Sequence, residues 1–213
     1  IADDMLTTTV MACPCKKLIA PAMNTRMFEN PILQDNLEKC RHYGMDIIMP
    51  DSGRLACGDV GSGKLPSEEV LVAAILKEIR YEKDMKGLKV LVTAGATQEA
   101  IDPVRFISNH STGKMGFALA KTAMQRGADV TVVAAHTSAE EPLYVNIRRV
   151  SSAADMFEAC KEEAKTADII IKAAAVADYT PVETADNKIK KSDDTIAITC
   201  KRTQDILAYL GAH

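Results

Sequence analysis

An alternation of short apolar strands with amphipathic helices after residue 88 constrains the fold of this 213-residue chain most strongly. The run Lys89–Thr93 (KVLVT) is rich in Val and Leu, which is typical of a strand buried on both faces of a parallel sheet. A helical pattern at Gly113–Arg126 and a strand pattern at Asp129–Ala134 follow it. This β–α order predicts a doubly wound parallel sheet, because parallel strands need crossover connections, which helices supply.

The rest of the chain also divides into helices and strands. In the helix Asn30–Tyr43, Asn30 is a typical cap, Pro31 stands in the first turn and Gly44 follows the end. A long loop is expected over Ala94–Thr112. Further helices are predicted at Ile1–Met11, Ser67–Arg80, Ala153–Lys165 and Asp205–Leu210, and strands at Lys17–Ala20, Asp46–Met49, Asn146–Val150, Asp168–Lys172 and Thr195–Thr199.

A polar segment divides the chain into two expected domains. Residues 81–87 (YEKDMKG) show neither helix nor strand periodicity, so we expect a linker there. It separates a first domain over residues 1–80 from a second over residues 88–213. The first domain contains a glycine-rich stretch, Asp51–Leu65, which we expect to be mobile.

Charge and composition argue against several classes of function. The 26 Lys and Arg stand against 29 Asp and Glu, so nonspecific binding to nucleic acid or to an anionic membrane is not favoured. Aromatic residues are 4% with no Trp, which argues against base stacking on single strands. No apolar run approaches the roughly 18 residues of a membrane span. We therefore expect small-molecule partners, with no nucleic acid and no membrane, and a cytoplasmic protein.

The cysteines indicate reduced thiols rather than a disulfide framework. The chain is long enough to build a core without disulfides. Cys13-Pro14-Cys15 is a C-x-C pair, but no second Cys or His pair stands at zinc spacing. The six cysteines are Cys13, Cys15, Cys40, Cys57, Cys160 and Cys200.

Glycines and polar residues gather in the loop after the first strand of the second domain. Gly95 and Gly113 would let the backbone approach an anion, and Arg105, Asn109 and Ser111 add polar groups. The pattern is neither the G-x-G-x-x-G fingerprint nor a P-loop. A phosphate or nucleotide site and a merely tight loop both remain open here.

A second candidate site follows the strand that ends at Lys172. The small residues Ala173 and Ala174 would let a flat ligand lie against the backbone. Asp178 could accept hydrogen bonds from a ribose or base, or face a metal ion. Lys188 opens the run K-I-K-K, whose charges could clamp a triphosphate or simply form a solvated basic loop.

The first domain offers two candidates of its own. Asn24 lies between a predicted strand and a predicted helix, and its amide could bind a carboxylate or merely form a helix-entry turn. Cys57 lies in the glycine-rich stretch beside Arg54, where a thiol on a closing flap could deliver a proton, or be an inert small hydrophobe.

Six stretches resemble two enzyme families. ADDMLTTTVMAC, PAMNTRMFENP and SGRLACGDVGSGKLP resemble the phosphopantothenoylcysteine decarboxylases, which are FMN enzymes. VTAGATQEAIDPVRFISNHSTGKMG and KAAAVADYTP with NKIKK resemble the phosphopantothenate–cysteine ligases. Their order resembles the bifunctional bacterial proteins of coenzyme A synthesis. The resemblance implies an α/β fold, with a flavodoxin-like or Rossmann-like decarboxylase portion followed by a doubly wound, parallel-sheet ligase domain.

The resemblance also implies roles for individual residues. In the decarboxylase portion Asn24 would hold the substrate carboxylate and Cys57 would donate a proton, with FMN as cofactor. In the ligase portion, which would join 4'-phosphopantothenate to cysteine with CTP and Mg²⁺, Arg105 and Asn109 would handle the acyl intermediate. The CTP residues would be Lys172, Ala173, Ala174, Asp178, Lys188, Gln204, Asp205, Ile206 and Leu207, with Gly95 and Ser111 in a phosphate loop. The resemblance assigns no metal ligand.

Assembly is likewise implied only by the resemblance. It implies a homo-oligomer, with a trimeric decarboxylase and a dimeric ligase. It also implies that the chain begins inside the decarboxylase and ends inside the ligase, so that we expect neither activity from it alone. Two other interpretations are a nicotinamide-dependent Rossmann oxidoreductase and an inactive assembly fragment.

Overall fold

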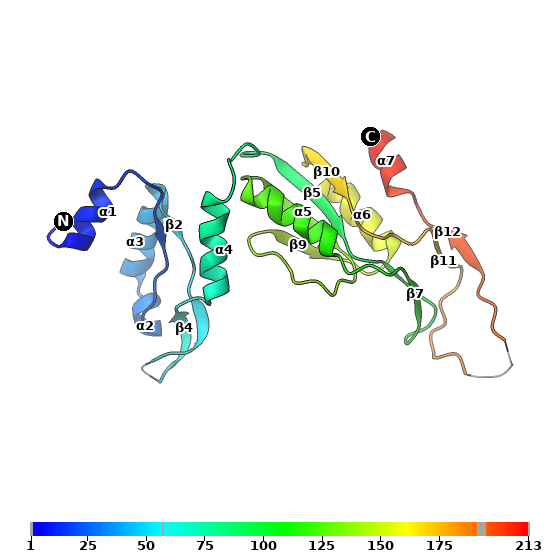
Figure 1. Cartoon of the computed structure of the whole chain (residues 1–213). Helices are drawn as coiled ribbons and strands as arrows, with labels where there is room; N and C mark the ends of the chain where they lie inside the picture. Colours follow the sequence, from blue (N-terminus) through cyan, green and yellow to red (C-terminus); the bar gives the residue numbers. More distant parts are fainter. Residues whose placement is uncertain (1, 57, 191–194, 213) are drawn as a thin grey trace. The chain divides into compact units, whose positions relative to one another are not determined.

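The chain forms two compact units, Ile1–Ile79 and Arg80–His213. The structure, a computed structural model, describes residues 2–56, 58–190 and 195–212 (Figure 1). Within these ranges the longest helices have 12 residues. No helix in this part of the chain is long and apolar enough to cross a membrane.

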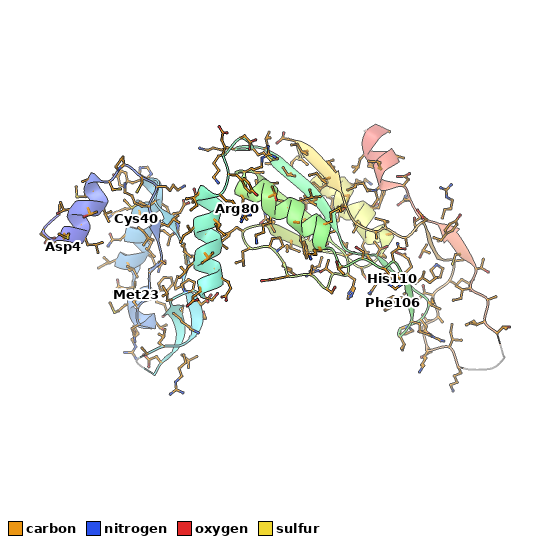
Figure 2. All side chains as sticks on the ribbon, viewed as in Figure 1. Asp4, Met23, Cys40, Arg80, Phe106 and His110 are labelled. Atoms are coloured by element: carbon orange, nitrogen blue, oxygen red, sulfur yellow. The ribbon has the colours of Figure 1, made fainter. Side chains whose placement is uncertain are left out.

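The first unit is built from short helices and two small pairs of strands. Its helix α1 begins at Met5 rather than at Ile1, because the Asp4 side chain accepts a hydrogen bond from the Thr7 backbone and caps it; Figure 2 labels Asp4 at this end. As predicted, Asn30 caps α3 and accepts from the Ile32 backbone at 2.9 Å. The elements are α1 (Met5–Ala12), β1 (Leu18–Ile19), α2 (Thr25–Phe28), α3 (Pro31–His42), β2 (Asp46–Ile47), β3 (Asp51–Arg54), β4 (Val60–Lys64) and α4 (Glu68–Ile79).

The glycine-rich stretch of the first unit forms an antiparallel hairpin, β3–β4, which the sequence analysis did not predict. Close packing explains two of its glycines, Gly61 and Gly63. A Cβ on Gly61 would lie 2.5 Å from the Thr25 hydroxyl, and one on Gly63 would lie 2.2 Å from the Met23 carbonyl oxygen. Gly63 also has a φ of +118°, a conformation that side chains strongly disfavour. The glycines therefore allow the hairpin to lie against the segment that carries Asn24.

The second unit contains the predicted parallel sheet. Its strand order is β10-β5-β8-β9, and all three pairings are parallel. The mixed α/β class predicted from the alternation of helices and strands is thus confirmed. The elements are β5 (Lys89–Ala94), β6 (Gln98–Ala100), β7 (Phe106–Ser108), α5 (Lys114–Gln125), β8 (Asp129–Ala134), β9 (Asn146–Arg149), α6 (Ala153–Glu163), β10 (Ile169–Lys172), β11 (Tyr179–Pro181), β12 (Cys200–Arg202) and α7 (Ile206–Ala212).

Helices cover both faces of this sheet (Figure 1). On one face Phe117 and Met124 of α5 pack against Val90 and Val92, the inward residues of β5. On the other face, α6 and α7 pack against the alternate strand residues, of which Leu91 is only 1% exposed. Because successive strand residues point to opposite faces, one apolar run supplies both cores.

Two segments, residues 94–112 and 195–199, differ from the sequence-based expectation. The long loop over residues 94–112 contains an antiparallel hairpin, β6–β7. Residues 195–199 lie outside the strands, and the strand begins at Cys200, where β12 pairs with β11. Within residues 81–87, Asp84 forms an ion pair with Arg126 and the Met85 backbone donates to the Arg126 carbonyl, so this segment is held to the end of α5.

Candidate functional site

The strand order creates a switch point between β5 and β10. The chain proceeds from β5 to β8 and β9 on one side, and returns to the other side as β10. Ligands of doubly wound sheets commonly bind at such a point, beyond the carboxyl ends of the two neighbouring strands. The two loops singled out in the sequence of the second unit both leave the sheet here.

Hydrogen bonds join these two loops directly. The Thr93 hydroxyl accepts from the backbone N–H groups of Ala173 and Ala174, both at 3.1 Å. The Ala175 backbone donates to the Gly95 carbonyl at 2.8 Å. Lys172 is the register partner of Thr93. The structure therefore brings Gly95, Lys172, Ala173 and Ala174 together, although about 80 residues separate the two loops.

The start of α5 closes tightly over the end of β5. Gly95 has a φ of +83°, and a Cβ on it would lie 2.4 Å from the His136 carbonyl oxygen. A Cβ on Gly116 would lie 2.6 Å from the Ala94 Cβ. The Ser111 hydroxyl accepts from the Gly113 backbone at 3.4 Å, so it lies at the same turn. Backbone rather than side chains thus forms this part of the site.

Asn109 connects this region to the second loop. Its Nδ2 donates to the Ala175 carbonyl at 3.4 Å, while the side chain stays exposed to solvent. Figure 2 labels its neighbours Phe106 and His110 close to β7. Asn109 thus lies beside the alanine segment, and its role stays a prediction.

A buried carboxylate, not singled out from the sequence, organises the neighbouring turn. The Asp102 side chain has no solvent exposure and accepts from the backbone N–H groups of Val104 at 2.9 Å and Ile189 at 3.1 Å. The Arg105 guanidinium binds the same carboxylate, with Nε at 2.9 Å, and also donates to the Ile189 carbonyl at 3.0 Å. We call Asp102, Arg105 and Ile189 the carboxylate clasp.

The carboxylate clasp has two consequences. The Arg105 side chain, followed by backbone N–H groups, holds the pKa of Asp102 well below its usual range. The clasp also anchors the middle of the K-I-K-K run, so that exposed Lys188 and Lys190 flank a fixed backbone position. The sequence signal was Asp-Pro-x-Arg, because Asp and Pro at these positions favour a turn closed by the carboxylate.

The predicted segment 204–207 lies next to the end of the alanine loop. The Thr203 backbone donates to the Asp178 backbone carbonyl at 2.9 Å, and Asp178 is exposed to solvent. Asp205 caps α7 by accepting from the Ala208 backbone at 3.0 Å and the Leu207 backbone at 2.9 Å, and these hydrogen bonds lower its pKa. Ile206 is buried in the core, whereas Gln204 is exposed and Leu207 is 63% exposed.

The first unit has a separate candidate group around Asn24. The Asn24 side chain caps α2 by accepting from the Arg26 backbone at 2.9 Å. Its Nδ2 donates to a carboxylate oxygen of Asp59, in the β3–β4 connection, at 2.9 Å. Cys57, the predicted proton donor, lies outside the described residues.

Comparisons with known proteins cover both units. The family described as DNA/pantothenate metabolism flavoprotein C-terminal domain matches residues 85–213. The family described as Flavoprotein matches residues 1–80.

Curated relatives share a single name. The coenzyme A biosynthesis bifunctional protein CoaBC of Haemophilus influenzae is 44% identical over 211 residues, which is 99% of this chain and 53% of the relative. The protein of that name from Bacillus subtilis is 46% identical over 214 residues, with 99% and 53% covered. The chain thus spans about half the length of the curated relatives that it matches.

Solved structures resemble the chain in fold. A crystal structure of the C-terminal domain of a CoaBC protein is 43% identical with a TM-score of 0.53, covering 60% of each chain. The DNA/pantothenate metabolism flavoprotein from Streptococcus pneumoniae is 29% identical, also with a TM-score of 0.53, over 59% of this chain and 65% of that one. The match over residues 85–213 shows that the chain belongs to the DNA/pantothenate metabolism flavoprotein family.

Proposed function

We propose that the chain serves coenzyme A biosynthesis as part of a bifunctional protein. Residues 1–80 belong to an FMN-dependent decarboxylase, residues 81–87 link the parts, and residues 88–213 belong to a CTP-dependent ligase. Sequence identity of 44% to a CoaBC protein over 99% of the chain supports this proposal. The observation that carries the ligase assignment is the direct bonding of the loops after β5 and β10 through Thr93.

The ligase step joins 4'-phosphopantothenate to cysteine. The substrate carboxylate attacks the α-phosphate of CTP, which forms an acyl-cytidylate and releases pyrophosphate. The cysteine amine then attacks the acyl carbon and releases CMP, leaving an amide. The first step brings an anion toward a triphosphate, so the site must supply positive charge.

The proposed roles follow the geometry of the two loops. Lys172, Ala173 and Ala174 line the CTP site at the end of β10, and the exposed Asp178 carboxylate accepts from the cytidine. Gly95 and Ser111 provide backbone and hydroxyl groups for phosphate at the start of α5. The segment Gln204, Asp205, Ile206 and Leu207 borders the nucleotide, with Ile206 as its core anchor.

The carboxylate clasp supports the role of the lysine loop. Lys188 binds the CTP phosphates, and the clasp reduces the backbone freedom that this loop would lose on binding. Asn109 and Arg105 act on the acyl intermediate, because Asn109 already reaches the alanine loop and half of the Arg105 side chain is open to solvent.

Magnesium fits this site as a partner of the phosphates. Within the described ranges, no three His, Cys, Asp or Glu side chains gather as a metal-binding group. Mg²⁺ is commonly held by substrate phosphates, waters and one or two carboxylates, so it would enter with CTP.

The decarboxylase portion uses the first unit. Bound FMN supplies the oxidation of the substrate thiol and the later reduction. Asn24 binds the carboxylate of phosphopantothenoylcysteine, and the hydrogen bond that its Nδ2 donates to the Asp59 carboxylate at 2.9 Å supports this role for the amide. Cys57 donates the proton in the final reduction. We further propose a cytoplasmic homo-oligomer, with decarboxylase trimers and ligase dimers.

A lysine substitution in the whole protein that contains these residues tests the ligase assignment. Lys188→Gln removes a charge from the triphosphate, so acyl-cytidylate formation should fall about 10²-fold. Lys165→Gln, after α6, is the matched control and should keep the rate. Pyrophosphate release with CTP and 4'-phosphopantothenate measures the effect. An unchanged rate in Lys188→Gln would refute the clamp, and binding of NAD instead of CTP would favour an oxidoreductase.

A further inference from the structure

Cys13 and Cys15 form a pair of thiols that the proposed reactions do not use. Their sulfur atoms lie 3.0 Å apart. Cys15 is exposed and Cys13 is half-buried, so small reagents can reach the pair. The strand β1 separates these cysteines from Asn24 along the chain.

The backbone around Cys13 holds the pair in place. The Cys13 N–H donates to the Thr9 carbonyl at 2.9 Å and ends α1, while its carbonyl accepts from Lys17 Nζ at 2.6 Å. Cys13 itself is extended, with φ −77° and ψ 125°, as expected for a residue before proline. Pro14 then fixes its own φ at about −65°. The thiols are therefore preorganised by local structure.

This geometry permits a disulfide. Two Cα–Cα steps keep the Cα atoms of Cys13 and Cys15 within about 7.6 Å, a limit that includes the common disulfide span of about 4.4–6.8 Å. The sulfur atoms already lie in contact. Closing the bond requires the sulfur atoms to approach from 3.0 Å to about 2.05 Å.

The two thiols are also chemically distinct. The hydrogen bond from Cys15 lowers the pKa of Cys13, to which the charge of Lys17 also contributes, and the same hydrogen bond raises the pKa of Cys15. Because the Lys17 ammonium lies at the Cys13 carbonyl, 2.6 Å away, its charge favours Cys13 as the thiolate, with Cys15 as the resolving thiol. Buried Cys160 is the opposite case, since burial raises its pKa to about 11.

We propose that Cys13 and Cys15 are a dithiol–disulfide exchange site for low-molecular-weight disulfides such as glutathione disulfide. The Cys13 thiolate attacks one sulfur of the reagent, forms a mixed disulfide and releases one glutathione thiolate. Cys15 then loses its proton and attacks Cys13 Sγ, which releases the second glutathione. Two protein thiols are oxidised and one reagent disulfide is reduced to two thiols.

Exchange of the reduced full chain with glutathione disulfide and glutathione at graded ratios tests the proposal. Acid quenching, alkylation and tryptic mass mapping identify the products, because the peptide Ile1–Lys16 contains both cysteines and no others. In the wild type this peptide should form an internal disulfide, seen as a loss of two hydrogen atoms. The ratio of glutathione disulfide to glutathione that this requires should be about tenfold lower than the ratio at which Cys40 or Cys200 gains glutathione.

Two matched variants separate the steps. Cys15→Ser should trap glutathione on Cys13, whereas Cys13→Ser should react more slowly, at Cys15. Both replacements lie at the surface end of α1, and circular dichroism checks that the fold is kept. The proposal is overturned if both cysteines of the wild type retain glutathione, or if the pair oxidises no more readily than Cys200.

Discussion

The buried Thr93 hydroxyl provides the sharpest test of how the two strand-end loops are joined. Thr93 is fully buried, and its Oγ1 accepts two backbone N–H groups, from Ala173 and Ala174. Thr93→Val keeps the side-chain shape but leaves both donors without this acceptor. An unsatisfied buried donor costs about 1–3 kcal/mol, and the two alanines are half-buried, so we expect a loss of about 2–4 kcal/mol in the free energy of unfolding.

A serine variant separates the hydroxyl from the methyl group. Thr93→Ser keeps the acceptor and loses one buried methyl, which costs about 1 kcal/mol. Thr122→Val, on the exposed face of α5, should change the unfolding free energy by less than about 0.5 kcal/mol. Urea unfolding followed by circular dichroism measures all three variants. Hydrogen exchange should show faster exchange of the Ala173 and Ala174 amides in Thr93→Val alone.

Two results would refute this reasoning. One is a Thr93→Val protein at least as stable as Thr93→Ser. The other is unchanged protection of the Ala173 and Ala174 amides in Thr93→Val. In either case the hydroxyl would not hold the second loop to the first, and the candidate site would lose its organising contact.

Three further predictions concern single side chains. Because Arg105 and backbone N–H groups lower the pKa of Asp102 in the fold, its carboxylate adds stability above about pH 4 that is lost as the pH falls below that value. Asp102→Asn should therefore lower the free energy of unfolding near pH 7, and that free energy should fall less on acidification than in the wild type. Urea titrations that give the same pH dependence for both proteins would contradict this. In the whole protein, Asn109→Asp should let the acyl-cytidylate accumulate, and failure to trap it by mass spectrometry would count against that role. Cys57→Ser in the whole protein should still release carbon dioxide but stall before 4'-phosphopantetheine, whereas normal product would exclude Cys57 as the proton donor.

Local interactions explain how much of the fold the sequence could predict. The Asn30 cap is a contact within a few residues, so short-range patterns are enough to reveal it. The parallel strand Lys89–Ala94 followed from an apolar run that must be buried on both faces. The hairpin β3–β4 escaped prediction because Gly61 and Gly63 are required by packing against Thr25 and Met23, which lie elsewhere in the chain.

The chain's own order of residues determined the α/β class, most of the central strands and the candidate loops at their ends. Only the tertiary structure decided how those loops meet. Thr93 reaches Ala173 across 80 residues and Asp102 reaches Ile189 across 87 residues. No local pattern encodes such pairings, because strand order and sheet register arise from the packing of distant segments, and these bring the hydroxyl and the carboxylate to their partners.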